Sequence, residues 1–258
     1  MVTQLPASQT SGLLYPSSDG QSMADNTKQF RWIVVIQQNL EWLFAHQETV
    51  FVAGDLLWYP VEGDPKSRMA PDVMVAFGRP KGDRGSYQQW LEASIPPQVV
   101  FEILSPGNRV TKMLEKLRFY ERYGVEEYYI YDPDDIELTG LTRSGEELAV
   151  VNQMSGWVSP RLGIRFDLSG DELQLYHPNG APFLSYVEIA QHAEQERQRA
   201  EQERQRTEQE RQRTEQERQR AEQAEQLASQ ERDRADQAEQ RAAQLASQLR
   251  AMGINPDE

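Results

Sequence analysis

Glu102 is the residue whose chemistry fits its surroundings least, because it stands inside the apolar run VVFEI at residues 99–103. Large apolar side chains on both faces of such a run are typical of a central strand that helices cover on both sides. An ionised carboxylate buried there without a partner would cost several kcal/mol, or it would stay protonated. We therefore predict that a cation, a hydrogen-bond donor or a water-filled cleft lies beside Glu102.

Asp72 is a second acid in an apolar context, since it follows Pro71 and opens the run VMVAF at residues 73–77. Taken alone, Asp72 could simply cap a turn at the start of a strand. Taken with Glu102, it predicts two carboxylates on neighbouring strands. Oxygen ligands of this kind suit Mg²⁺ or Mn²⁺. A cation bound there would hold a phosphate oxygen and lower the pKa of an attacking water.

A lysine is the third group that such a site would need, to orient the water or to offset developing negative charge. The chain has only five lysines, and two of them, Lys112 and Lys116, follow Glu102 in the next predicted helix. Glu102 lies about 7 Å back from the end of its strand. A helix that returns antiparallel covers about 12 Å in eight residues, and its side chains lean towards its N-terminus. This geometry favours Lys116, with Lys112 in reserve; the alternative is a solvated lysine on the helix flank.

The elements that must position these residues follow from hydrophobic period and turn residues. Residues 27–45 have the apolar period of an amphipathic helix. Strands are predicted at residues 49–60 (one or two, around Gly54), 70–78, 96–104 and 125–135, and a hairpin through Ser144-Gly145 over residues 136–151. This order predicts an α/β fold whose last core pair is a right-handed parallel crossover.

The crossover helix is predicted to begin near Asn108, a plausible N-cap, and to end at Gly124. Its apolar residues predict one buried stripe, made of Val110, Met113, Leu114, Leu117 and Tyr120.

The amino-acid composition limits the classes of function that the protein can have. The 258 residues carry a net charge of −14, and residues 1–190 alone hold 15 basic and 25 acidic side chains. The chain therefore lacks the overall excess of basic side chains that is typical of nucleic-acid-binding proteins, although a local basic patch or a divalent cation could replace it. No apolar run reaches membrane-spanning length, so no membrane partner is expected. Cysteine is absent, which excludes disulfides and thiolate metal sites and suits a reducing cytoplasm.

Amino-acid composition and repeat pattern divide the chain into four segments. Residues 1–25 lack the features of a signal peptide and are predicted to be a flexible polar leader. Residues 26–190 have globular composition and hold all five tryptophans. Residues 191–252 contain a seven-residue repeat of the type ERQRAEQ without Gly or Pro, which predicts one long helix, and residues 253–258 form a tail.

The repeat leaves two interpretations of that helix open. Its first seam carries alanine and threonine, and its second carries Glu203, Glu210 and Glu217 before it becomes apolar in the distal half. Large aliphatic residues at both seams would be needed for a strong coiled coil. The helix is therefore either a solvated rod held by side-chain pairs or a weak coiled coil that makes the chain a homo-oligomer.

The stretch PDV … VVFEILSPGNRVTKMLEKLRFYERYGVEEYYIYDPD resembles the Uma2 family (DUF820) of the PD-(D/E)XK nuclease superfamily. Matching positions are Pro71-Asp72, Glu102 to Pro106, Lys116, Tyr120, Gly124-Val125, Glu127-Tyr128 and Asp132-Pro133. The similarity extends over about residues 30–190 and includes SPRLGIRF and LYHPNG. Chains with this leader and an E/R/Q-rich tail are, by resemblance, mostly cyanobacterial.

This resemblance implies a restriction-endonuclease-like mixed sheet flanked by helices, followed here by the long C-terminal helix. It implies a Mg²⁺-dependent (or Mn²⁺-dependent) DNA endonuclease with Asp72 and Glu102 as metal ligands and Lys116 as the catalytic lysine. The superfamily's lysine normally stands two residues after the acid, where this chain has Leu104. The alternative is a nuclease-like domain that has lost activity and presents the helical tail to a partner.

Other polar residues are weaker candidates. Asp55, after Gly54, could be a third carboxylate or a turn residue. Glu41 could be an upstream acid or part of a solvated face. A calcium loop is only superficially suggested by Asp132, Asp134 and Asp135. Three histidines are isolated and form no ligand pair: His46, His177 and His192.

Overall fold

The structure is a computed structural model that describes residues 14–18, 20, 24–107 and 110–251. The chain forms two compact units, Met1–Ile189 and Ala190–Glu258. None of the helices in the described residues has an apolar stretch long enough to span a bilayer.

A six-stranded mixed sheet is the centre of the first unit, with the order β1-β3-β5-β6-β7-β8. Only β5 and β6 are parallel, and the other neighbours are antiparallel. Its strands are β1 (Val50–Gly54), β3 (Val73–Phe77), β5 (Val99–Ile103), β6 (Glu127–Asp132), β7 (Glu137–Ser144) and β8 (Glu147–Val150). The predicted α/β fold with a parallel β5–β6 pair is therefore confirmed.

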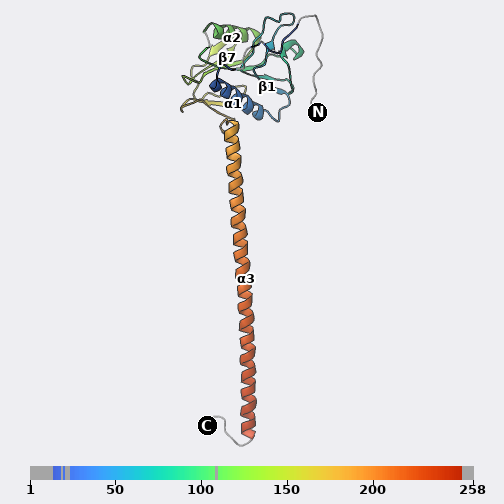
Figure 1. Ribbon diagram of the computed structural model, residues 1–258, viewed down its shortest axis with the longest axis vertical. Coiled ribbons are helices and arrows are strands. Elements are labelled where there is room, and N and C mark those ends of the chain that lie inside the picture. The colour runs from blue at the N-terminus through green and yellow to red at the C-terminus, as the bar shows by residue number, and fades with distance from the viewer. Residues whose placement is uncertain (1–13, 19, 21–23, 108–109, 252–258) are drawn as a thin grey trace. The chain divides into compact units, whose positions relative to one another are not determined.

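Helices α1 (Thr27–Leu43) and α2 (Val110–Tyr123) pack on opposite faces of this sheet (Figure 1). The α1 side holds a core with Ile36, Leu40 and Phe101, and the α2 side holds a second core with Tyr120 and Tyr128. Strand β5 lies between the two cores, and all five of its residues are buried. The continuous apolar run around Glu102 thus forms a central strand, as predicted.

Helix α2 faces the sheet with a different stripe from the predicted one. Val110 is 77% exposed and Leu114 is 50% exposed, whereas Tyr120 is fully buried. The inward face instead follows Met113, Lys116, Leu117 and Tyr120, at the spacing i, i+3, i+4, i+7. The prediction was wrong for two positions because the stem of Lys116 occupies the centre of the buried face.

The ends of α2 are only partly described. The predicted N-cap, Asn108, lies outside the described residues. Gly124 ends the helix with a φ of +94°, and a Cβ there would lie 3.2 Å from Pro96. Glycine satisfies both the left-handed backbone and this close approach.

Short pairings that the sequence did not predict complete the first unit. Strands β2 (Trp58–Tyr59) and β4 (Tyr87–Gln88) pair in parallel, and β4 leads into a 3₁₀ helix, η1 (Gln89–Leu91). Strands β9 (Arg165–Asp167) and β10 (Gln174–Tyr176) pair antiparallel.

Part of the predicted leader packs against the rest of the first unit. The ring of Tyr15 packs against Tyr59 and Trp90, with centroids 5.2 and 5.0 Å away. The Tyr59 hydroxyl donates to the carbonyl of Pro16 at 2.8 Å. Residues 1–13 lie outside the described part of the chain.

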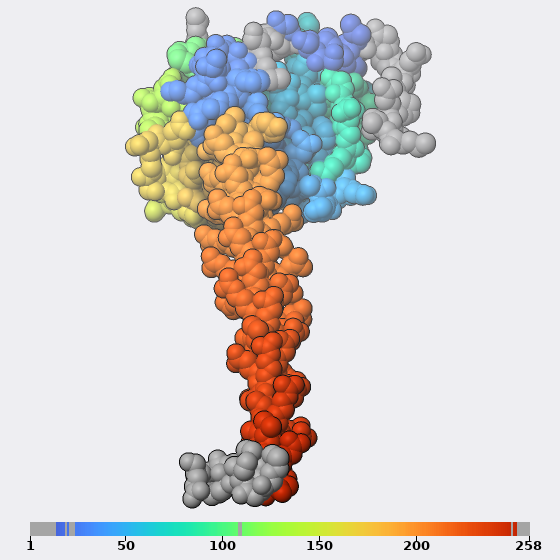
Figure 2. All heavy atoms as spheres, turned by 60° about the horizontal axis from the view of Figure 1, so that its bottom comes forward, coloured from blue at the N-terminus to red at the C-terminus, as the bar shows by residue number. Residues whose placement is uncertain are grey.

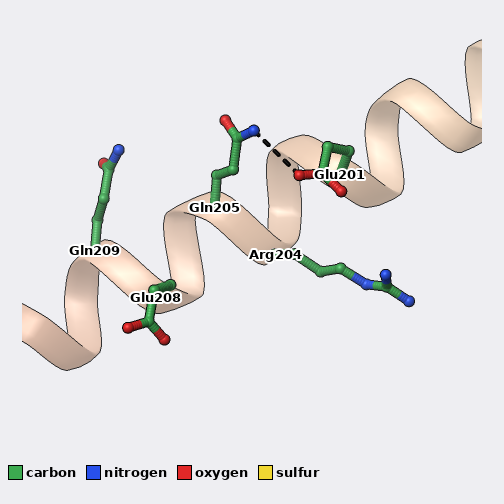
Figure 3. Close-up of a pocket in the computed structure, with 5 residues that line it drawn as sticks. All are labelled: Glu201, Arg204, Gln205, Glu208 and Gln209. Atoms are coloured by element: carbon green, nitrogen blue, oxygen red, sulfur yellow. Dashed lines mark hydrogen bonds between the residues drawn. The ribbon is translucent and has the colours of Figure 1, made fainter.

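Helix α3 (Tyr186–Ala251) continues through the second unit. Its described side chains there are exposed almost throughout (Figure 2). Pairs such as Arg211 with Glu208 join neighbouring turns at i and i+3, and Gln205 donates to Glu201 at 3.2 Å (Figure 3). The hollows between these side chains are lined by one helix alone, so they provide no enclosed site.

Candidate functional site

Asp72 and Glu102 face each other across two neighbouring strands. The antiparallel register of β3 and β5 sets Val73 opposite Phe101, so the next positions, Asp72 and Glu102, lie opposite one another. Residues directly opposite in a sheet project from the same face. The Ile103 N–H donates to Oδ2 of Asp72 at 2.6 Å and fixes that carboxylate at the end of β5.

Both oxygens of Glu102 have donors from α2. Lys116 Nζ lies 2.5 Å from Oε2, and the Tyr120 hydroxyl donates to Oε1 at 2.5 Å. Glu102 is only 2% exposed, and the Lys116 side chain is 20% exposed. The structure therefore supplies the cation and the donor that the buried glutamate requires.

Burial and neighbouring charges shift the pKa values of Asp72 and Lys116. Burial first, and then the negative charge of Glu102, raise the pKa of Asp72 to about 8. Burial works to lower the pKa of Lys116, but the charges of Glu102 and Asp72 outweigh it, so that pKa is raised. Below a pH of about 8, the site thus favours a proton on Asp72 and a positive charge on Lys116.

Tyr128 is a polar residue of the site that the sequence did not single out for chemistry. It lies on β6 opposite Val100, on the sheet face that carries Glu102, and its ring centroid is 4.9 Å from that of Tyr120. Its buried hydroxyl has no hydrogen-bond partner among the described residues. Strand alternation places Tyr128 on this face, but the lack of a partner depends on tertiary packing.

Asp55 lies next to the site through its backbone. It follows β1 with a φ of +49°, and its N–H donates to the Asp72 carbonyl at 3.2 Å. Its charge contributes to the raised pKa values of Asp72 and Lys116, after the larger effects named above. Asp55 is therefore both a turn residue and an electrostatic neighbour of the carboxylate pair.

The remaining candidates lie outside this group. Lys112 is exposed, and Glu41 is exposed and accepts from Gln37 at 2.8 Å. Asp132 accepts backbone N–H groups of its own turn, from Asp134 at 2.9 Å and from Asp135 at 3.3 Å.

The three histidines play no part in the carboxylate group. His177 packs between the rings of Trp42 and Phe183, and burial lowers its pKa. His46 and His192 are exposed.

A hollow of about 460 Å³ lies beside β1, between α1 and the loop at residues 81–84. Its charged residues are balanced, two basic and two acidic: Lys81, Arg84, Glu41 and Asp83. The Arg84 guanidinium is also bound to Glu92 at 2.6 Å. This hollow therefore has no pronounced preference for an anion.

A further buried acid, Glu127, is a structural residue. It lies at the start of β6 and accepts from Tyr129 at 2.9 Å, from the Arg161 N–H at 2.6 Å and from the Ser159 hydroxyl. Burial raises its pKa in spite of these donors. Glu127 thus fastens the loop at Ser159 to the sheet, on the face opposite Tyr128.

The carboxylate pair fits a divalent cation. Oδ1 of Asp72 accepts no hydrogen bond from the described residues and remains available as a ligand. Mg²⁺ is commonly held by one or two carboxylates and completed by waters and substrate phosphates. Within the described residues no group of three histidine or acidic side chains could hold a metal ion. A cation held by Asp72 and Glu102 would therefore need solvent or substrate to supply its other ligands.

The tail and the chain as a whole each show a similarity to known proteins. Residues 183–254 match a family described as "Helicobacter pylori protein of unknown function (DUF874)". One solved structure found is that of "a putative nuclease belonging to DUF820" from Anabaena variabilis, with 18% identity and a TM-score of 0.39. The alignment covers 52% of this chain and 72% of that one. No curated protein matches the chain.

The globular part gives the match that identifies the chain. Residues 33–175 match the family Uma2, described as "Putative restriction endonuclease". The matched segment spans more than half of the chain and contains Asp72, Glu102, Lys116 and Tyr128. The chain belongs to the Uma2 family.

Proposed function

We propose that this protein is a Mg²⁺-dependent DNA endonuclease (or a Mn²⁺-dependent one) that hydrolyses phosphodiester bonds at the site of Asp72, Glu102 and Lys116. The observation that carries this proposal is the juxtaposition of two opposed carboxylates with one ammonium on a buried face of the sheet. The family supports a nuclease, and its description as a restriction endonuclease supports DNA as the substrate.

The two acids have complementary roles. When bound, a divalent cation would polarise a phosphate oxygen and lower the pKa of water. Asp72 would bind it through Oδ1 while the Ile103 N–H holds Oδ2, and Asp72 would lose its proton on binding. Glu102 would be the second residue to hold the cation, and the Tyr120 hydroxyl would keep its carboxylate oriented.

Lys116 is the residue best placed to act on the substrate. Its ammonium is held by Glu102 and is 20% exposed, so it lies between the buried acid and solvent. In the active complex, the ammonium would turn from Glu102 to a phosphate oxygen and offset the charge that develops in the transition state. From α2, Lys116 would thereby take the role that the superfamily's lysine normally has at the position of Leu104.

A second candidate function is an inactive assembly module that presents α3 to a partner. It is favoured by the excess of acidic side chains in residues 1–190 and by the two oxygens of Glu102, which already accept from Lys116 and Tyr120. In this case the Lys116–Glu102 pair would serve only stability.

Plasmid cleavage distinguishes the two functions. The full chain is incubated with supercoiled DNA and Mg²⁺, beside Asp72→Asn, Lys116→Met and the matched control Lys112→Met, which changes an exposed lysine of the same helix. The endonuclease predicts cleavage by the wild type and by the control, and a loss of about 100-fold or more in the two site variants. Equal rates in all four proteins, or no cleavage by any, would favour the assembly module.

Two further proposals concern the cellular location and the oligomeric state of the protein. The absence of cysteine supports a cytoplasmic location. The exposed leucines of the distal repeat, Leu227 and Leu245, support self-association through α3.

A further inference from the structure

The Tyr128 hydroxyl is an exception among the buried tyrosines of the described chain. Tyr87 donates to the Ile95 carbonyl at 2.8 Å, Tyr129 donates to Glu127 at 2.9 Å, and Tyr131 accepts from the Leu173 N–H at 3.2 Å. Tyr128 is fully buried, and its hydroxyl has no partner within the described residues. A buried polar group without a hydrogen bond costs free energy, so its retention calls for an explanation.

The position of Tyr128 connects this hydroxyl to the carboxylate pair. Val100 is opposite Tyr128 in the parallel β5–β6 register, so Glu102 is the next residue of β5 on the same face. The ring of Tyr128 packs edge-on against Tyr120, the residue that donates to Glu102. Burial, and then the charges of Glu102 and Asp72, raise the pKa of Tyr128, so the hydroxyl stays protonated and able to donate.

The hydroxyl can therefore bond to a group that enters this face of the sheet. The donors to Glu102 and to Oδ2 of Asp72 are already in place, from Lys116, Tyr120 and Ile103. Water that accompanies Mg²⁺ or Mn²⁺ would bring new oxygen atoms to this face, because such cations keep several of their waters when bound.

We propose that Tyr128 is a positioning residue of the cation site, whose hydroxyl forms a hydrogen bond with a water molecule that enters together with a divalent cation. This inference rests on the proposed function, because it assumes that Asp72 and Glu102 bind the cation. It adds a third polar group to them and gives the buried hydroxyl a hydrogen-bond partner.

Tyr128→Phe tests the inference because it removes only the hydroxyl and keeps the ring in the aromatic core. The full chain and the variant are compared by thermal melting without metal and by calorimetric titration with Mn²⁺. We expect the melting temperature without metal to stay the same or rise, and the Mn²⁺ affinity to fall by about tenfold or more, as for other residues that support metal ligands.

Tyr129→Phe is the matched control, since it removes the hydroxyl of the neighbouring tyrosine, which already has a partner on the other face. It should lower the melting temperature and leave Mn²⁺ affinity unchanged. Equal Mn²⁺ affinity in the wild type and Tyr128→Phe would overturn the inference and leave the proposed function standing. Lower stability or failed folding of Tyr128→Phe would overturn it as well, because the hydroxyl would then have a partner in the resting fold. A wild type that binds no Mn²⁺ would overturn both proposals.

Discussion

Lys116 Nζ lies 2.5 Å from Oε2 of Glu102, although 14 residues separate the two in sequence. Helix α2 carries the ammonium back over the strand that ends after Glu102. The position two residues beyond Glu102 is Leu104, whose N–H donates to the Tyr131 carbonyl at 2.8 Å. The charge that this site requires is thus provided by a helix, and its energetic coupling to Glu102 can be measured.

A double-mutant cycle should detect that coupling. Glu102→Gln leaves Lys116 without its ionic partner, and Lys116→Met leaves Glu102 as a buried charge with only Tyr120 beside it. Breaking a buried pair from one side costs about 3–5 kcal/mol, and the partial exposure of Lys116 favours the lower end for Glu102→Gln. We expect the double variant to be more stable than additivity predicts by about 1–3 kcal/mol in urea unfolding. Additive losses would show that the two side chains do not interact in solution.

The stability of the protein without metal should fall as the pH rises towards 8. The pKa of Asp72 is raised to about 8 in the folded state, far above its ordinary value of 3.8. Between these values the folded state binds a proton that the unfolded state has lost, so the free energy of unfolding decreases with pH, by at most about 1.4 kcal/mol per unit. Chemical denaturation between pH 5 and 8 should show this slope in the wild type. Asp72→Asn should flatten it, and the same slope in both proteins would contradict the assignment.

Glu127→Gln should weaken the fold and leave the cation site intact. Glu127 is as buried as Glu102, but its three donors fasten the loop at Ser159 on the other face of the sheet. An amide group cannot accept from all of them, and we expect a loss of about 1–3 kcal/mol in urea unfolding. Unchanged stability would show that the loop is held by other contacts.

The sequence predicted the centre of the site better than its surroundings. Glu102 could be found because a carboxylate in a two-sided apolar run demands a partner, and helix geometry selected Lys116. The burial of α2 was mispredicted at Leu114, because apolar type alone does not show that the stem of Lys116 takes the buried position. Tyr128 could be assigned to a face by alternation, but no local pattern reveals that its hydroxyl lacks a partner.

Strand β4 and the pairing of β2 with it were missed for one physical reason. Trp58 pairs with Tyr87 across a long separation in sequence, and the paired strands β2 and β4 are only two residues long. Such short strands have almost no periodicity of their own. Their pairing is decided by tertiary contacts, as is the link from Glu127 to the loop at Ser159.

The distal half of α3 should control self-association. Leu227 and Leu245 are exposed, and each could contribute roughly 1.5–3 kcal/mol if it were buried against a second copy. The proximal seam carries Ala, Thr and Glu and buries little area. We expect deletion after Gln223 to lower the oligomer order in sedimentation while the first unit keeps its fold. The same stoichiometry in both proteins would place the contacts outside the deleted segment.

The central claim is that Asp72 and Glu102 together form a divalent-cation site, and calorimetric titration with Mn²⁺ tests it most directly. Wild type, Asp72→Asn, Glu102→Gln and the buried-acid control Glu127→Gln are titrated at a pH above 8, where Asp72 is largely ionised. We predict one binding site in the wild type and in Glu127→Gln, and none in either of the other two variants. Equal binding in all four proteins, or no binding in the wild type, would contradict the claim.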